Sequence, residues 1–103
     1  MDEMVVPVSG FYRHYKHDPK GTPYNYMYEI IGCARNTEDK TFSVLYRPLY
    51  ENDWMKPAIL NARPLEMFME SVVVNSQAMS RFEMITDPEL IAKLTVAKEA
   101  LYS

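Results

Sequence analysis

The sequence predicts a mostly β (α+β) domain: a small SH3-like barrel or a strongly bent antiparallel sheet, with a short internal helical turn and a C-terminal helix. Several short runs are rich in aromatic and β-branched residues and are separated by turn residues, which is typical of strands. A run near the C-terminus instead has its apolar residues at helical spacing. Because exposed strand edges need protection, closure into a barrel is favoured over an open α+β sheet.

The length of 103 residues fits one domain, and we expect a flexible lead-in over residues 1–8 and a single domain over residues 9–103. The net charge of -3 argues against binding to duplex nucleic acid, which needs a basic surface. The single cysteine, Cys33, cannot form an intramolecular disulfide, which suits a cytoplasmic location. No long apolar run predicts a membrane span.

The N-terminal half reads as three strands. Residues 9–17 alternate in a strand-like way, and the turn residues of 18–23 follow. Residues 24–35 form a second predicted strand, in which Gly32 marks a bulge or a close backbone approach. A polar turn at 36–40 then leads into a third strand at 41–46, so these two strands form a hairpin.

The C-terminal half begins with an irregular segment over 48–57 and a short strand over 58–62. Pro64 suits the first position of a helical turn, and good helix formers follow it. Strands are predicted at 71–74 and 81–85. The pair Asp87–Pro88 then starts a helix over about 88–102, whose apolar stripe consists of Leu90, Ile91, Leu94, Ala97 and Leu101.

Four motifs in order carry a family likeness: GFYRHYK at 10–16, YRPLY at 46–50, RPLEMF at 63–68 and RF at 81–82. Together they resemble domain-of-unknown-function family 1653, which is found in bacteria and phages. The resemblance implies a compact single-domain fold and brings no established activity or catalytic residues. The chain departs from the family pattern in a tyrosine-rich segment that follows the first motif, HDPKGTPYNYM at 17–27.

The motif arginines are interleaved with tyrosines, and this pattern nominates a ligand site. An arginine presents a planar fork of donors that matches carboxylate or phosphate, and tyrosine rings offer stacking faces. In the alternative interpretation, the arginines pair with Glu29, Glu66 and Glu70 to brace the fold, and the tyrosines are core residues. The candidate ligand-binding residues are Tyr12, Arg13, His14, Tyr46, Arg47, Tyr50 and Arg63.

These observations favour a non-enzymatic binding module for a small anionic, nucleotide-like ligand, with sequestration of a signalling nucleotide as its expected use. The alternatives are a protein- or RNA-interaction adaptor and a small hydrolase that uses His14. No nucleophile motif, phosphate-binding glycine loop or cofactor fingerprint is present, so we expect no cofactor. His14 and His17 fall on opposite faces of a strand, which argues against a metal site. The sequence leaves open whether the protein forms a homo-oligomer.

Overall fold

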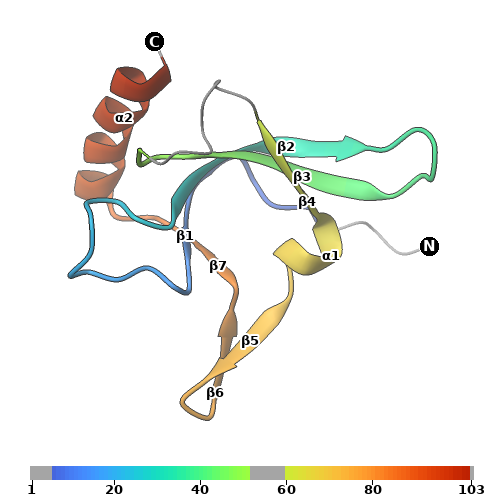
Figure 1. The fold of residues 1–103 in the computed structure, drawn as a ribbon, viewed down its shortest axis with the longest axis horizontal. Helices are drawn as coiled ribbons and strands as arrows, with labels where there is room; N and C mark the ends of the chain where they lie inside the picture. The colour runs from blue at the N-terminus through green and yellow to red at the C-terminus, as the bar shows by residue number, and fades with distance from the viewer. Residues whose placement is uncertain (1–5, 52–59, 103) are drawn as a thin grey trace.

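The computed structural model describes residues 6–51 and 60–102 and shows a mostly β chain with two helices (Figure 1). The described part of the chain contains a five-stranded antiparallel sheet in the order β4-β3-β2-β1-β7 and a separate two-stranded sheet of β5 and β6. The elements in chain order are β1 (Gly10–His14), β2 (Met27–Arg35), β3 (Phe42–Pro48), β4 (Asn61–Pro64), α1 (Leu65–Phe68), β5 (Ser71–Val74), β6 (Gln77–Ser80), β7 (Phe82–Met84) and α2 (Pro88–Tyr102).

The mostly β class, the internal helical turn and the C-terminal helix are confirmed. Strand pairing within the described ranges does not close the sheet into a barrel, and β4 and β7 form its two edges. The sequence did not predict β6, because all four of its residues are exposed and polar or small residues dominate it. Of the strand predicted at 58–62, residues 58–59 lie outside the described residues, as do residues 52–57 of the preceding irregular segment.

The five-stranded sheet has a different hydrophobic cluster on each face. On one face Tyr12, Tyr28, Ile30, Val44 and Phe82 pack with Phe68 of α1. On the other face, α2 covers a cluster of Met27, Leu49, Ile85 and Leu94. Figure 1 shows α2 against one side of the sheet, while α1 and the protruding β5–β6 hairpin lie away from it. Each face of the sheet therefore packs in its own apolar cluster.

A bulge in β2 sets which side chains share a face. The register with β3 shifts between Ile30 and Gly32, so Ile31 has no direct partner across the ladder. The predicted irregularity at Gly32 is confirmed by this shift. Ile30 lies opposite Tyr46 before the bulge, and Cys33 lies opposite Val44 after it.

The tyrosine-rich segment before β2 is a folded loop and not the strand predicted over 24–26. Tyr24 and Tyr26 have φ angles of 61° and 58°, in the left-handed region where extended pairing is impossible. Between them, the Asn25 side chain is buried and hydrogen-bonded to the backbone of Asp18 and Thr22. These side-chain bonds replace strand pairing, so β2 starts only at Met27.

Candidate functional site

The candidate site lies on the sheet face opposite α2, where Phe68 of α1 packs on the buried rings. Residues directly opposite each other on neighbouring antiparallel strands point to the same face. This pairs His14 with Phe82, Tyr12 with Tyr28, and Ile30 with Tyr46 across the sheet. At the far edge, Arg63 of β4 lies opposite the fully buried Val44 of β3. The face therefore carries a row of rings, and Arg63 of the edge strand β4 reaches across it to the Phe82 ring of the other edge strand, β7.

His14 is a buried histidine in the middle of aromatic rings. Its ring meets Phe82 edge-on at a centroid distance of 4.9 Å and lies roughly parallel to the Tyr26 ring at 5.6 Å. Burial, with the nearby charges of Arg63 and Arg81, lowers the pKa of His14 to about 4. Its Nδ1 accepts a hydrogen bond from the backbone N–H of Lys16 at 3.1 Å. This bond assigns the proton of the neutral ring to Nε2, which is thus a donor.

Arg63 is distinguished from the other motif arginines by its lack of an acidic partner. Its guanidinium carbon lies 5.4 Å from the centroid of the Phe82 ring. Its Nε is buried and has no hydrogen-bond partner, and no described carboxylate lies within ion-pair distance of the guanidinium. The Nε atoms of Arg13 and Arg81 are likewise buried without a hydrogen-bond partner, so what sets Arg63 apart is the lack of a carboxylate near its guanidinium.

Tyrosines extend the ring row away from His14. The Tyr28 and Tyr50 hydroxyls are 3.1 Å apart, and the Tyr46 ring meets Tyr28 edge-on at 5.3 Å. Burial raises the pKa of both Tyr28 and Tyr50, so these phenols remain neutral donors and acceptors. Tyr26 lies between His14 and Tyr50, with its ring centroid 6.4 Å from that of Tyr50.

Five of the seven predicted ligand-binding residues belong to this face: Tyr12, His14, Tyr46, Tyr50 and Arg63. Tyr12 is a buried core residue whose hydroxyl donates a hydrogen bond to the Val8 carbonyl at 2.8 Å, so its role on this face is packing. Arg13 and Arg47 lie on the opposite face, because each is adjacent in a strand to a residue of this one. Arg13 there lies 3.7 Å from Glu83.

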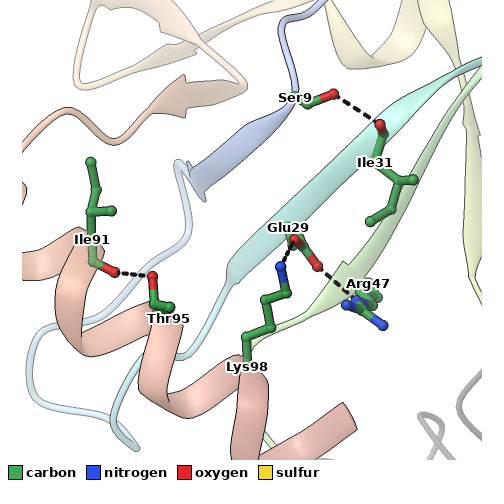
Figure 2. Close-up of polar contacts among 7 residues, drawn as sticks. All are labelled: Ser9, Glu29, Ile31, Arg47, Ile91, Thr95 and Lys98. Atoms are coloured by element: carbon green, nitrogen blue, oxygen red, sulfur yellow. Dashed lines mark hydrogen bonds and ion pairs between the residues drawn. The ribbon is translucent and has the colours of Figure 1, made fainter. Parts of the chain in front are cut away.

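Arg47 belongs to an ion-pair network under α2 (Figure 2). Its Nε donates to Glu29 at 2.8 Å, and Lys98 of α2 contacts the other oxygen of the same carboxylate at 2.7 Å. The Arg47 guanidinium also lies 4.0 Å from the centroid of the Tyr102 ring. Figure 2 shows the Arg47 and Lys98 side chains converging on Glu29. For this arginine the arrangement matches the bracing alternative.

Two residues of the face were absent from the sequence-based set: Tyr26 and Phe82. Phe82 belongs to the RF motif, and its pairing with His14 needs the long-range register of β1 and β7. Arg81 pairs with Glu70 at 2.8 Å and lies close enough to His14 to affect its pKa. The RF motif already pointed to Arg81 in the sequence. The position of Tyr26 depends on the geometry of the loop before β2, which no sequence pattern encodes.

Other chemistry is poorly supported by the described residues. None of their carboxylates is hydrogen-bonded to His14, since Glu29 and Glu70 are engaged by cations. They contain no group of three His, Cys, Asp or Glu side chains placed to hold a metal ion. No helix among them has the length and apolar character needed to span a membrane.

A cavity of about 230 Å³ opens beside His14. Its lining includes Tyr15, His17 and Ser80, together with Arg13 and Glu83 of the opposite sheet face. Larger cavities of about 460 and 490 Å³ lie beside Phe42 and along α2. The described residues that line these two include no arginine or histidine, and the one cation among them is Lys40, which lines the cavity beside Phe42 together with Glu66.

Comparisons with known proteins agree with the motif pattern. A crystal structure of a DUF1653 protein from Bordetella bronchiseptica superimposes with a TM-score of 0.58 and 28% identity, covering 78% of this chain and 92% of the other. No curated protein matches the chain. The family described as protein of unknown function (DUF1653) matches residues 10–84, most of the described domain. The chain therefore belongs to the DUF1653 family.

Proposed function

We propose that this protein is a non-enzymatic binding module for a small, anionic, nucleotide-like ligand that binds on the face formed by His14, Phe82 and Arg63. The observation that carries the proposal is the Arg63 guanidinium, which contacts the Phe82 ring and has no described carboxylate partner. A planar fork of donors without an acid is suited to bidentate binding of phosphate or carboxylate.

The neighbouring groups favour the same ligand chemistry. His14 is neutral, with an Nε2–H donor that no described residue accepts, so it adds a hydrogen bond without adding charge. Tyrosine rings extend from this point along the face and supply flat apolar surface. SH3-like barrels often present such aromatic grooves, and we include in the proposal that this domain is related to that fold. Sequestration of a signalling nucleotide is the use that such a non-catalytic site would have.

Thermal-shift and calorimetric titration with nucleotides and inorganic phosphate test the proposal. A ligand at one hundred times its Kd stabilises the folded state by roughly 2.7 kcal/mol, which gives a measurable rise in melting temperature. We expect this rise for the wild-type protein and its loss in Arg63→Ala. Arg35→Ala is the matched control, because Arg35 also stacks on a phenylalanine ring, at 5.4 Å from Phe42, but lies at the far end of the β2–β3 hairpin.

Two results would refute the proposal. The first is the absence of any stabilisation by these ligands at millimolar concentration. The second is equal ligand affinity for wild-type protein and Arg63→Ala, since the proposal depends on that guanidinium.

A second candidate, a protein-interaction surface, is favoured by exposed apolar side chains on α1 and the β5–β6 hairpin. Met67, Met69, Val73 and Met79 are each more than two-fifths exposed, and Val73 reaches 74%. Clusters of exposed apolar residues often mark contact sites. A pull-down that resists nuclease and is abolished by Val73→Glu would support a protein partner, whereas capture lost on nuclease treatment would indicate RNA.

A further inference from the structure

We infer that the ligand of the Arg63 face carries a planar ring, as a nucleobase does, and that Tyr26 is the surface on which this ring stacks. This inference rests on the proposed function and deepens it by naming the ligand class. A bare anion such as phosphate would use the arginine fork and leave the ring surface empty. A ring-bearing anion would use both.

The Tyr26 ring is held in place and is also accessible. One part of the ring lies near His14, at a centroid distance of 5.6 Å and an interplanar angle of 30°. The residue nevertheless remains 38% exposed, whereas Tyr28 of the same face is buried. An aromatic side chain that is supported from below and open above is a stacking platform, and such platforms accept any nucleobase because each has a π face.

The backbone at Tyr26 indicates that this position is maintained at a cost. Its φ of 58° is unfavourable for a residue with a large side chain, and Tyr24 shares the same region with a φ of 61°. Strained backbone of this kind persists only where the surroundings enforce it, and it gathers at ligand sites. The strain places the Tyr26 ring over His14 instead of in the β2 ladder, which starts one residue later.

Asn25 is the residue that enforces this conformation, and we assign it a positioning role. Its Oδ1 accepts from the Asp18 N–H at 2.9 Å, and its Nδ2 donates to the carbonyls of Asp18 and Thr22 at 2.8 and 2.7 Å. Its own carbonyl oxygen lies 2.7 Å from the His17 Nδ1. With 8% of its surface exposed, Asn25 ties both ends of the loop together before any ligand arrives. Pre-organisation of this kind reduces the ordering cost of binding.

The platform and the arginine fork lie on either side of one pair of rings. His14 contacts both Tyr26 and Phe82, and Arg63 contacts Phe82. A ligand whose ring lies on Tyr26 can therefore direct its anionic group past His14 toward Arg63. This arrangement predicts selectivity for the ring-bearing member of any matched pair of anions, with little discrimination among bases.

The test compares adenosine 5′-monophosphate with ribose 5-phosphate by isothermal titration calorimetry, because the two probes share a phosphate and differ by the base. Wild-type protein is expected to bind the nucleotide about tenfold or more tightly than the sugar phosphate, since stacking on one aromatic residue has this magnitude. Tyr26→Ala should bring this ratio close to one, and Tyr26→Trp should restore it. Arg63→Ala should weaken both probes and leave the ratio unchanged.

The role of Asn25 is tested by a double-mutant cycle read through the same ratio. Asn25→Ala should lower the ratio, and in the Tyr26→Ala background it should lower it no further, because its effect passes through that ring. Thermal unfolding of each variant checks that it is folded. Equal binding of both probes to wild-type protein, or an unchanged ratio in Tyr26→Ala, would overturn this inference while leaving the anion site intact. Failure of both probes to bind would overturn the proposed function as well.

Discussion

Double substitution of Arg47 and Lys98 is expected to destabilise the protein by more than the sum of the two single substitutions. Both cations contact the Glu29 carboxylate, at 2.8 and 2.7 Å, and only 12% of the Glu29 side chain is exposed. Each cation alone can compensate for the burial of this charge. Their joint removal leaves a carboxylate in a mostly dry environment with no partner among the described side chains.

The magnitudes follow from the contacts that each change removes. Arg47→Ala removes a charged hydrogen bond and the stacking on Tyr102 while Lys98 remains, so we expect a loss of about 2 kcal/mol. Lys98→Ala should cost about 1 kcal/mol, because its side chain is 37% exposed and solvent screens the pair. An unpaired buried charge costs roughly 3–5 kcal/mol, so the double variant should lose about 4–5 kcal/mol.

Urea unfolding provides the assay, with the free energy of unfolding extrapolated to water and the m value compared between variants. The expected coupling between the two sites is about 1–2 kcal/mol. Thermal unfolding should show the same order, since 1 kcal/mol corresponds to roughly 4–8 °C in a domain of this size. Arg35→Ala removes an equal charge from an arginine stacked on Phe42 and should change little. Strict additivity, or an Arg47→Ala variant as stable as the parent, would refute the reasoning.

Three further predictions concern stability. Leu94→Asp places a charge at a fully buried position of α2 and should lower the free energy of unfolding in urea by about 4 kcal/mol or more. The matched control Val96→Asp, at a position 68% exposed on the same helix, should change this free energy by about 0.5 kcal/mol at most. Equal losses in the two variants would show that α2 is not docked as described. Because the folded pKa of His14 is about 4 and the unfolded value about 6.5, its contribution is complete above pH 6.5 and is lost as the pH falls toward 4, on the order of 2–3 kcal/mol. The difference in unfolding free energy between wild type and His14→Gln, measured over that range, should therefore vary with pH; a constant difference would contradict the burial of a neutral ring. Gly10→Ala should cost about 1–3 kcal/mol in the same assay, because φ is 152° and the new Cβ would lie 3.3 Å from the Met84 Cε; an unchanged midpoint would argue against this backbone conformation.

Local signals account for the parts of the fold that the sequence predicted. The helix Pro88–Tyr102 has its start signal and its apolar stripe within one short stretch, so no distant contact is needed to recognise it. The strand β2 was recognised from composition, but its start at Met27 was not, because Asn25 hydrogen bonds across the loop decide where pairing begins. Closure of the sheet depends on how edge strands meet in space, which composition does not encode.

The candidate site was predicted in its residue types but not in its geometry. The adjacent pairs Tyr12–Arg13 and Tyr46–Arg47 were assigned to one site, although strand alternation sends neighbours to opposite faces. Applying that rule within each motif would have separated Arg47 from Tyr46. The distinction between Arg63 and Arg47 was out of reach, because it depends on which of them finds a carboxylate across the sheet.

The position of β1 between β2 and β7 has a consequence for synthesis on the ribosome. The hairpin of β2 and β3 can pair as soon as it emerges, but the outer edge of β1 stays unpaired until Phe82–Met84 is available. Non-local pairing of this kind is slow and exposes an open edge in the meantime. Nascent chains that end at Ser80 and are tethered through a linker spanning the ribosomal exit tunnel should therefore remain sensitive to protease at residues 10–14, and chains extended through Tyr102 on the same linker should become resistant. Protection of the shorter chains would show that the first strand is secured without the last.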